Sequence, residues 1–189
     1  MYSSPALLAC LRAETGPFVL RERERGAGRK IEIRASEIKR SCPMIRATMS
    51  ETLRMYHTPW TIRYAKEDIQ LNVTPRRKVA AGSYVVVPHH GPSFDPEGFP
   101  NPLQFNPGRS VGQNIGRMHT GSLRPWGIGA FQCKGRALAE VQFLSFVAGF
   151  INIWDVVNLQ PWDDMGAKPT VGVAAQTGMV TVALRRATE

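Results

Sequence analysis

Cys133 lies in a glycine-rich stretch and has the sequence context of a stabilised thiolate. Gly127, Gly129 and Gly135 surround it, and a helix is predicted to begin one or two residues after the cysteine. Glycines permit tight turns and a close approach of the backbone to a flat ligand. A helix N-terminus offers free N–H groups and partial positive charge, which stabilise a thiolate. Such a thiolate can ligate haem iron, although a single cysteine near a helix start is more often structural.

Three helices are predicted around this stretch. The first begins at Pro5 and ends near Gly16, and the third runs from the cysteine stretch to about Trp154. The second runs from Pro43 to Tyr56, where apolar residues recur with a period of 3.6: Ile45, Met49, Leu53 and Tyr56. Glu51 and Arg54 lie off that stripe and three residues apart, so they share a helix face.

Short strands and loops are predicted between and after these helices. The expected strands are Thr61–Tyr64, Asp68–Val73 and Ser83–Val87, with a terminal hairpin of Val171–Ala175 and Met179–Leu184 around Gln176, Thr177 and Gly178. Residues 21–34 are expected to form an exposed connector or a frayed helix. Residues 88–130 are rich in Pro and Gly and lack periodicity, which is typical of a long functional loop.

The chain of 189 residues carries a formal charge of +9, which is concentrated in its first half. Residues 1–94 hold 16 Lys and Arg against 8 Asp and Glu, whereas residues 95–189 hold 8 against 7. This excess predicts either an acidic partner (nucleic acid, an anionic membrane or an acidic protein) or simply a solvated basic face. Because the aromatic residues are not interleaved with the Arg cluster and no nucleic-acid motif is found, we expect no nucleic acid.

The composition predicts a globular chain without a membrane span. Hydrophobic residues make up 43% and charged residues 21%, and three cysteines are too few for a disulfide scaffold. The longest apolar stretch, Val141–Ile153, is interrupted by Gln142, Ser145 and Asn152. We therefore expect neither a transmembrane segment nor a secretory signal.

Three motifs resemble the cytochrome P450 family, in fungal-type form. Residues 125–136 (PWGIGAFQCKGR) resemble its haem-ligating loop, aromatic-Gly-x-Gly-x-[Arg/His]-x-Cys-x-Gly, with Trp126 as the aromatic and Phe131 in place of the Arg or His that binds a haem propionate. Residues 51–54 (ETLR) match Glu-x-x-Arg, and residues 105–110 (FNPGRS) resemble Phe-x-Pro-x-Arg-Phe with a final Ser. The motifs follow one another in the family's order.

The resemblance implies roles for particular residues. Cys133 would be the axial ligand of haem b iron, and Arg63, Trp126, Gly127, Gly129, Phe131 and Gly135 would contact the cofactor. Glu51, Arg54 and Arg109 would form a buried structural triad, and residues 58–63 and the turn at 176–179 would line the substrate pocket. Lys134 and Arg136 would face an acidic redox partner such as NADPH-cytochrome P450 reductase.

The implied fold is the C-terminal part of the α+β cytochrome P450 fold, in a single partial domain over residues 1–189. Its expected parts are a J-like and K-like helical segment (1–57), short strands (58–87), the meander and cysteine loop (88–132), an L-like helix (133–155) and a terminal hairpin (156–189). The distal I helix that handles oxygen is expected to be absent, so no catalytic residue is assigned within the chain. Family members commonly reside at the endoplasmic reticulum membrane; no location is assigned to this chain, and the expected absence of their anchor leaves the cytoplasm open.

The expected function is a haem-thiolate monooxygenase of a small lipophilic substrate such as a sterol, fatty acid or secondary metabolite. We expect this chain alone to be inactive in hydroxylation. Two alternatives stay open. One is a non-catalytic remnant or haem-binding fragment. The other is a haem-thiolate isomerase, because Trp126 looks like the branch that contains cholesterol 7-alpha-hydroxylase-like and prostacyclin-synthase-like enzymes.

Overall fold

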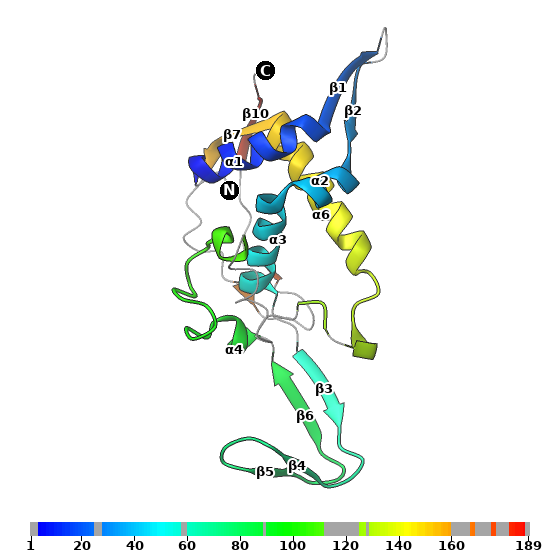
Figure 1. Ribbon diagram of the computed structural model, residues 1–189, viewed down its shortest axis with the longest axis vertical. Coiled ribbons are helices and arrows are strands. Elements are labelled where there is room, and N and C mark those ends of the chain that lie inside the picture. Colours follow the sequence, from blue (N-terminus) through cyan, green and yellow to red (C-terminus); the bar gives the residue numbers. More distant parts are fainter. Residues whose placement is uncertain are drawn as a thin grey trace.

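The computed structural model has mixed helix and strand (Figure 1). It describes residues 4–24, 28–57, 60–88, 90–111, 125–127, 129–159, 167–168, 175–176 and 182–187. The helices are α1 (Pro5–Thr15), α2 (Ala35–Ser41), α3 (Pro43–Tyr56), α4 (His90–Ser93) and α6 (Arg136–Ile153), with short 3-10 turns η1 (Gly16–Phe18), η2 (Pro107–Ser110) and η4 (Gly129–Phe131). The strands are β1 (Val19–Glu24), β2 (Gly28–Ile33), β3 (Trp60–Tyr64), β4 (Ile69–Leu71), β5 (Arg77–Val79), β6 (Tyr84–Pro88), β7 (Trp154–Leu159), β8 (Ala167–Lys168), β9 (Ala175–Gln176) and β10 (Val182–Arg186).

The core lies where α1, α2, α3 and α6 meet (Figure 1). Each helix contributes at least one apolar side chain that is fully buried: Leu11, Ile38, Ile45 and Ile151. Burial of apolar surface is the main favourable contribution to folding, and each such side chain is worth about 1.5–3 kcal/mol. This packing positions α6, and with it the cysteine that precedes the helix.

The first and second predicted long helices form where the sequence indicates. Pro5 and Pro43 open α1 and α3, since a proline at the first helical position lacks only an N–H that would have no intrahelical partner. The N–H groups of Met44 and Ile45 are instead capped from another helix, because the Glu14 carboxylate accepts from them at 2.9 and 3.2 Å. This contact also fastens the end of α1 to the start of α3.

The prediction of a connector or frayed helix over residues 21–34 is wrong, because β1 and β2 form an antiparallel hairpin there. The pair nearest the body, Val19 and Ile33, packs against the helical core. Ile33 reaches Gly149 of α6, where an added Cβ would lie 2.7 Å from the Ile33 Cδ1 atom. Burial of this pair against α6 stabilises the strands despite the high charge of the hairpin. Helix α2 follows directly and was not predicted.

Two hairpins project from the body beyond α3 (Figure 1). Strand β3 pairs with β6, and β4 pairs with β5, so the three predicted strands are present and β5 is an additional one. Asp68 ties the outer hairpin together, since its carboxylate accepts from the Ala81 N–H at 2.9 Å and lies 2.7 Å from Lys78 Nζ. Within the predicted long loop, the structure forms α4, η2 and η4.

The described terminal strands pair with segments outside the predicted hairpin. Strand β10 is antiparallel to β7, which directly follows α6, and Val182 lies opposite Leu159. Ala175, predicted in the first hairpin strand, belongs to β9 and pairs back to Lys168 of β8. Residues 171–174 and 177–181 of the predicted hairpin lie outside the described residues, so pairing within it stays a prediction.

Helix α6 is long and apolar enough to cross a membrane, although the sequence led us to expect no such segment. Its 18 residues have a mean hydropathy of 1.3, enough to cross a membrane on these two criteria alone. A core helix of a soluble protein can meet the same criteria of length and composition. Leu144, Val147, Ala148 and Ile151 of α6 are buried against the other helices, whereas Leu138 and Phe146 of the same helix are exposed.

Candidate functional site

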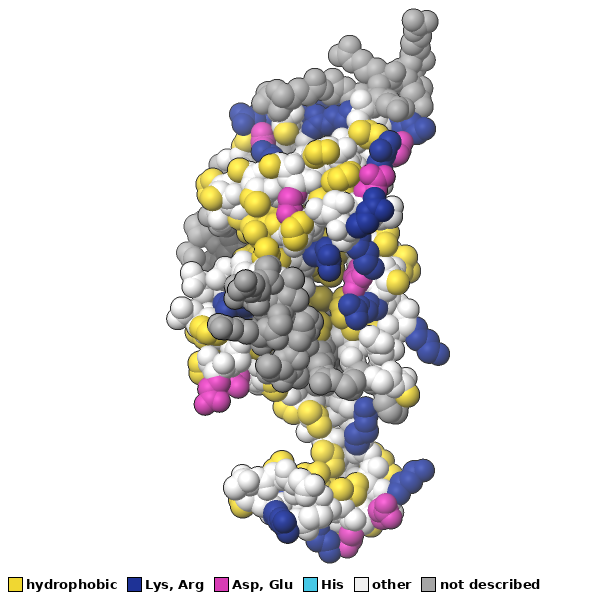
Figure 2. Space-filling view, viewed as in Figure 1, with side chains coloured by type: hydrophobic (Ala, Val, Ile, Leu, Met, Phe, Trp, Pro, Cys, Tyr) yellow, Lys and Arg dark blue, Asp and Glu magenta, His cyan; other side chains and the backbone are white. Residues whose placement is uncertain are grey.

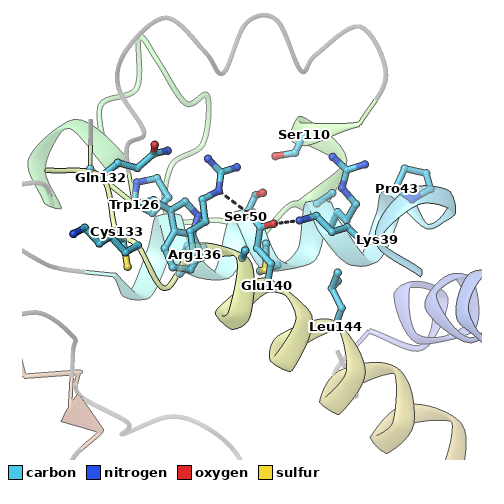
Figure 3. Close-up of a pocket in the computed structure, with 18 residues that line it drawn as sticks. Lys39, Pro43, Ser50, Ser110, Trp126, Gln132, Cys133, Arg136, Glu140 and Leu144 are labelled. Carbon is cyan, nitrogen blue, oxygen red and sulfur yellow. Dashed lines mark hydrogen bonds and ion pairs between the residues drawn. The ribbon is translucent and has the colours of Figure 1, made fainter. Parts of the chain in front are cut away.

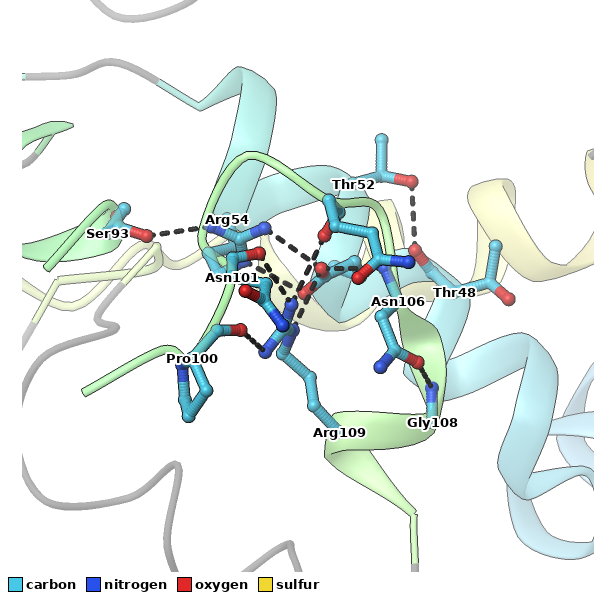
Figure 4. A network of polar contacts seen from close by, with 11 residues as sticks. Thr48, Thr52, Arg54, Ser93, Pro100, Asn101, Asn106, Gly108 and Arg109 are labelled. Atoms are coloured by element: carbon cyan, nitrogen blue, oxygen red, sulfur yellow. Dashed lines mark hydrogen bonds and ion pairs between the residues drawn. The ribbon is translucent and has the colours of Figure 1, made fainter. Parts of the chain in front are cut away.

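A fully buried carboxylate–guanidinium pair lies on α3 (Figure 4). Glu51 and Arg54 are both 0% exposed. Arg54 Nε donates to Glu51 Oε2 and Arg54 Nη2 donates to Oε1, each at 2.9 Å. The third arm of the guanidinium, Nη1, donates to the Ser93 carbonyl at 2.8 Å. The guanidinium carbon also lies 5.3 Å from the centroids of Phe94 and Phe99, so its charge is compensated on every side.

Arg109 joins this pair from η2, which is distant in sequence (Figure 4). Its Nε donates to Glu51 Oε1 at 3.0 Å, and the backbone N–H of Asn106 donates to the same oxygen at 3.0 Å. The remaining guanidinium N–H groups of Arg109 donate to the carbonyls of Pro100, Asn101 and Gln104, at 3.0, 3.4 and 3.1 Å. The structure thus brings together Glu51, Arg54 and Arg109, and the network fastens the irregular segment around residues 93–109 to α3.

The charge of Glu51 is set by its surroundings. Burial by itself raises the pKa of a carboxyl group, but the hydrogen bonds from Arg54, Asn106 and Arg109 outweigh burial and hold the pKa of Glu51 below its ordinary value. Glu51 is therefore ionised at neutral pH. The described contacts of the network join α3 to the backbone at Ser93, Pro100 and Asn106.

The cysteine loop is closed by backbone hydrogen bonds. The N–H of Cys133 donates to the Trp126 carbonyl at 2.7 Å, and the N–H of Gln132 donates to the Gly129 carbonyl at 3.1 Å. Gly127 and Gly129 have φ values of +73° and +60°, in the left-handed region that favours glycine. An added Cβ at Gly129 would meet no atom within 4 Å, so backbone conformation rather than space requires glycine there.

Cys133 lies three residues before the first residue of α6 (Figure 3). The side chain is exposed and forms no disulfide. Gly135 is the N-cap residue of α6, and the N–H of Arg136 donates to the Cys133 carbonyl at 3.3 Å. A Cβ on Gly135 would lie 3.7 Å from Cys133 Sγ. The sulfur is thus accessible and lies near the start of α6.

A cavity of about 720 Å³ lies between α3, the start of α6 and the cysteine loop (Figure 3). Cys133 and Trp126 lie at one end of it and Lys39 and Pro43 at the other (Figure 3). Its described charged lining consists of four cations and one carboxylate: Lys39, Arg46, Lys134, Arg136 and Glu140. Figure 2 shows Lys and Arg side chains gathered along the side of the molecule that α2 and α6 form.

The other residues predicted to contact a cofactor are placed as follows. Trp126 is half-buried and lines the cavity, and Phe131 belongs to η4. Arg63 lies on β3 with an exposed side chain, and its Nη1 donates to the Ile62 carbonyl at 3.0 Å. Gln176 is in β9. The roles of these residues toward a cofactor stay predictions.

Two groups of polar contacts near the site were missed by sequence reasoning. Glu14 caps α3, and Glu140 accepts from Lys39 and Arg136. The i,i+4 spacing of Arg136 and Glu140 is a signal that could have indicated one of these contacts. Lys39 is about 100 positions from Glu140 and carries no such signal.

The described part of the cysteine loop fits a haem on three observations. The thiol is exposed, it lies at a helix start, and an added Cβ at Gly129 would meet no atom within 4 Å. A thiol that ligates iron must be reachable by the metal, and a macrocycle beside it would need room along the loop backbone. Cys133 would hold the iron, and the loop from Trp126 to Gly135 would contact the ring.

Comparison with known proteins identifies the family. The family profile "Cytochrome P450" matches residues 18–180. This match covers most of the chain and includes Glu51, Arg54, Arg109 and Cys133. The chain belongs to the cytochrome P450 family.

Curated relatives agree with this assignment. The chain is 27% identical over 143 residues to "Cytochrome P450 monooxygenase poxD" of Penicillium oxalicum, which covers 69% of this chain and 30% of the relative. It is 30% identical over 148 residues to "Cholesterol side-chain cleavage enzyme, mitochondrial" of Sus scrofa, and the aligned region covers 78% of this chain and 28% of the relative. The chain therefore spans less than a third of the length of these relatives, and the family is one of monooxygenases that carry haem.

A solved structure shows the same fold. The crystal structure of the cytochrome P450 CYP102L1 superposes with a TM-score of 0.76 at 19% identity, over 97% of this chain and 39% of that one. At this identity the likeness concerns the fold alone. It confirms the expected α+β fold as part of the cytochrome P450 fold.

Proposed function

We propose that this chain provides the thiolate side of a haem-dependent monooxygenase, with Cys133 as the axial ligand of a haem b iron. The observation that carries the proposal is the exposed Cys133 thiol, placed three residues before α6 in a loop closed by the Trp126 carbonyl. When bound, a thiolate-ligated haem supplies oxygen activation. The chain's own contribution is to present and orient the thiolate, through the loop glycines and the packing of α6.

The remaining loop residues would shape the proximal face of the cofactor. Trp126 and Phe131 would supply apolar contact, and Gly127, Gly129 and Gly135 would keep the backbone close to the ring. Arg63 would neutralise a haem propionate, because a guanidinium offers the paired N–H groups that a carboxylate accepts. The network of Glu51, Arg54 and Arg109 would hold the segment that precedes the loop.

The proposed substrate is a small lipophilic molecule, such as a sterol, a fatty acid or a secondary metabolite. Relatives of this chain include a "Cholesterol side-chain cleavage enzyme, mitochondrial" and, in Streptomyces melanosporofaciens, a "Cyclooctat-9-en-7-ol 5-monooxygenase". Both names denote oxidation of a lipophilic compound. The proposed electron donor is an acidic redox protein, since Lys39, Arg46, Lys134 and Arg136 surround the cavity beside Cys133.

The activity of the whole protein would require polypeptide beyond this chain. Relatives are more than three times as long as the matched part, and a haem on this chain alone would be open on its distal face. Oxygen chemistry needs a site from which water is excluded. We therefore propose that residues 1–189 form one partial domain that binds haem without efficient hydroxylation. A non-catalytic haem-binding fragment is the second candidate, favoured by the same difference in length.

Haem reconstitution tests this function. The chain is mixed with haem, reduced and exposed to carbon monoxide, and a red-shifted Soret band of the thiolate type is expected. Cys133→Ala should abolish this band. Cys10→Ala is the matched control, because Cys10 is also exposed but lies on α1, and it should leave the band unchanged. Absence of haem uptake by the wild-type chain contradicts the proposal.

A further inference from the structure

Glu140 is the only acidic side chain among the described residues that line the cavity beside Cys133. It is 7% exposed, whereas the two cations that it contacts are about half exposed. Lys39 Nζ lies 2.6 Å from its Oε2 atom, and Arg136 Nε donates to its Oε1 atom at 2.7 Å (Figure 3). Each carboxylate oxygen thus has its own cationic partner, which fixes the orientation of the group.

These contacts join two elements at the point where the cysteine loop begins α6. Lys39 lies in the last turn of α2, and Arg136 is the first residue of α6. The backbone N–H of Arg136 in turn donates to the Cys133 carbonyl at 3.3 Å. An unbroken series of contacts therefore runs from α2 through Glu140 and Arg136 to the backbone of Cys133.

Apolar packing does not hold this part of α6. Arg136, Ala137 and Leu138 are exposed, and Glu140 is the first buried residue along the helix. The first buried apolar side chain, Leu144, comes a full turn later. Because exposed helix ends fray readily, a contact at Glu140 has a large effect on the order of the first turn.

Glu140 is charged under ordinary conditions. Burial by itself raises the pKa of its carboxyl group, but the hydrogen bonds from Lys39 and Arg136 outweigh burial and hold the pKa below its usual value.

We propose that Glu140 is a positioning residue for Cys133, which it holds through Arg136 by anchoring the first turn of α6 to Lys39 of α2. This inference rests on the proposed role of Cys133 as the haem ligand. The described contacts of the Glu140 carboxylate are with Lys39 and Arg136 rather than with the Cys133 sulfur. Its contribution is to keep the first turn of α6, and with it the backbone of Cys133, in place.

Hydrogen–deuterium exchange of the haem-free chain tests the anchoring directly. In Glu140→Gln, exchange over residues 134–139 should become about tenfold faster at the hydrogen-bonded amides of Arg136 and Ala139, since a partly buried ion pair is replaced by weaker neutral contacts. Amides beyond Leu144 and those of α3 should keep their wild-type rates. Asp68→Asn is the matched control, because it removes a carboxylate that pairs with a lysine at 2.7 Å on a distant hairpin. Glu140→Asp should restore part of the protection.

A spectroscopic measurement connects this anchor to the sulfur. In haem-reconstituted Glu140→Gln, the fraction of carbon monoxide complex with the thiolate-type Soret band should fall severalfold, and Asp68→Asn should keep the wild-type fraction. Unchanged exchange at 134–139, or exchange that rises equally throughout α3 and α6, overturns the inference. An unchanged thiolate fraction also overturns it. If the wild-type chain takes up no haem, the proposed function fails, whereas the exchange rates still decide whether Glu140 anchors the turn.

Discussion

Arg109 Nε lies 3.0 Å from Glu51 Oε1, although the two residues are 58 positions apart in the sequence. Glu51 is also paired with Arg54 on its own helix, so that one buried carboxylate connects α3 to the segment that leads toward the cysteine loop. The chain therefore leaves η2 from a segment that is fastened to α3.

Removal of this carboxylate should destabilise the chain strongly. Glu51→Gln leaves two guanidiniums close together without their shared counter-ion, and we expect the free energy of unfolding to fall by about 3–5 kcal/mol. Urea unfolding followed by circular dichroism measures the change. Lys78→Met breaks an exposed pair with Asp68 and should have no measurable effect. Equal effects of the two substitutions would contradict the structural role of Glu51.

The same carboxylate predicts a loss of stability in acid. The pKa of Glu51 in the folded chain lies below its ordinary value, which is near 4.3 in an unfolded chain. Between these two pKa values the unfolded state binds more protons than the folded state. The stabilisation by Glu51 is therefore complete above the unfolded value and is lost as the pH falls through the folded one. Urea midpoints measured from pH 7 to pH 3 should decline less in Glu51→Gln than in wild type.

The sequence allowed the prediction of local contacts better than that of distant ones. The spacing of Glu51 and Arg54 placed them on one helix face, and Pro43 marked the start of α3. The position of Arg109 beside them followed only from the family resemblance, because no local pattern relates η2 to α3. Glu14 as the cap of α3 was not predictable, since it depends on how α1 and α3 pack.

The strands show the same limit. The hairpin of β1 and β2 was missed because its charged residues obscure the single apolar pair, Val19 and Ile33, that packs against the core. The pairing of β10 with β7 was missed because strand partners are set by the path of the chain after α6. Neither pairing has a local signal, because a contact between two separate segments leaves no periodic pattern in the sequence.

The three cysteines should differ in their reaction with iodoacetamide. Cys42 is fully buried. Its burial, together with a smaller effect of the Glu14 charge, raises the pKa of its thiol to about 11. Because the thiolate is the reactive form, Cys42 should stay unmodified at pH 8. Cys10 and Cys133 are exposed and should react. Added haem should protect Cys133 and leave Cys10 reactive. Peptide mass spectrometry measures the labelling of each cysteine. Equal labelling of Cys133 with and without haem would argue against ligation.

Gly149 should tolerate alanine only when its neighbour is shortened. An added Cβ would lie 2.7 Å from Ile33 Cδ1 and 4.0 Å from Cγ1. The end of the Ile33 side chain must therefore move, and we expect Gly149→Ala to cost about 1–3 kcal/mol of unfolding free energy. Ile33→Val removes Cδ1, so the double variant should recover much of this loss in a double-mutant cycle. Gly91→Ala is the control, since a Cβ there meets no atom within 4 Å. Additive effects of the two substitutions would show that β2 does not pack on α6 at this position.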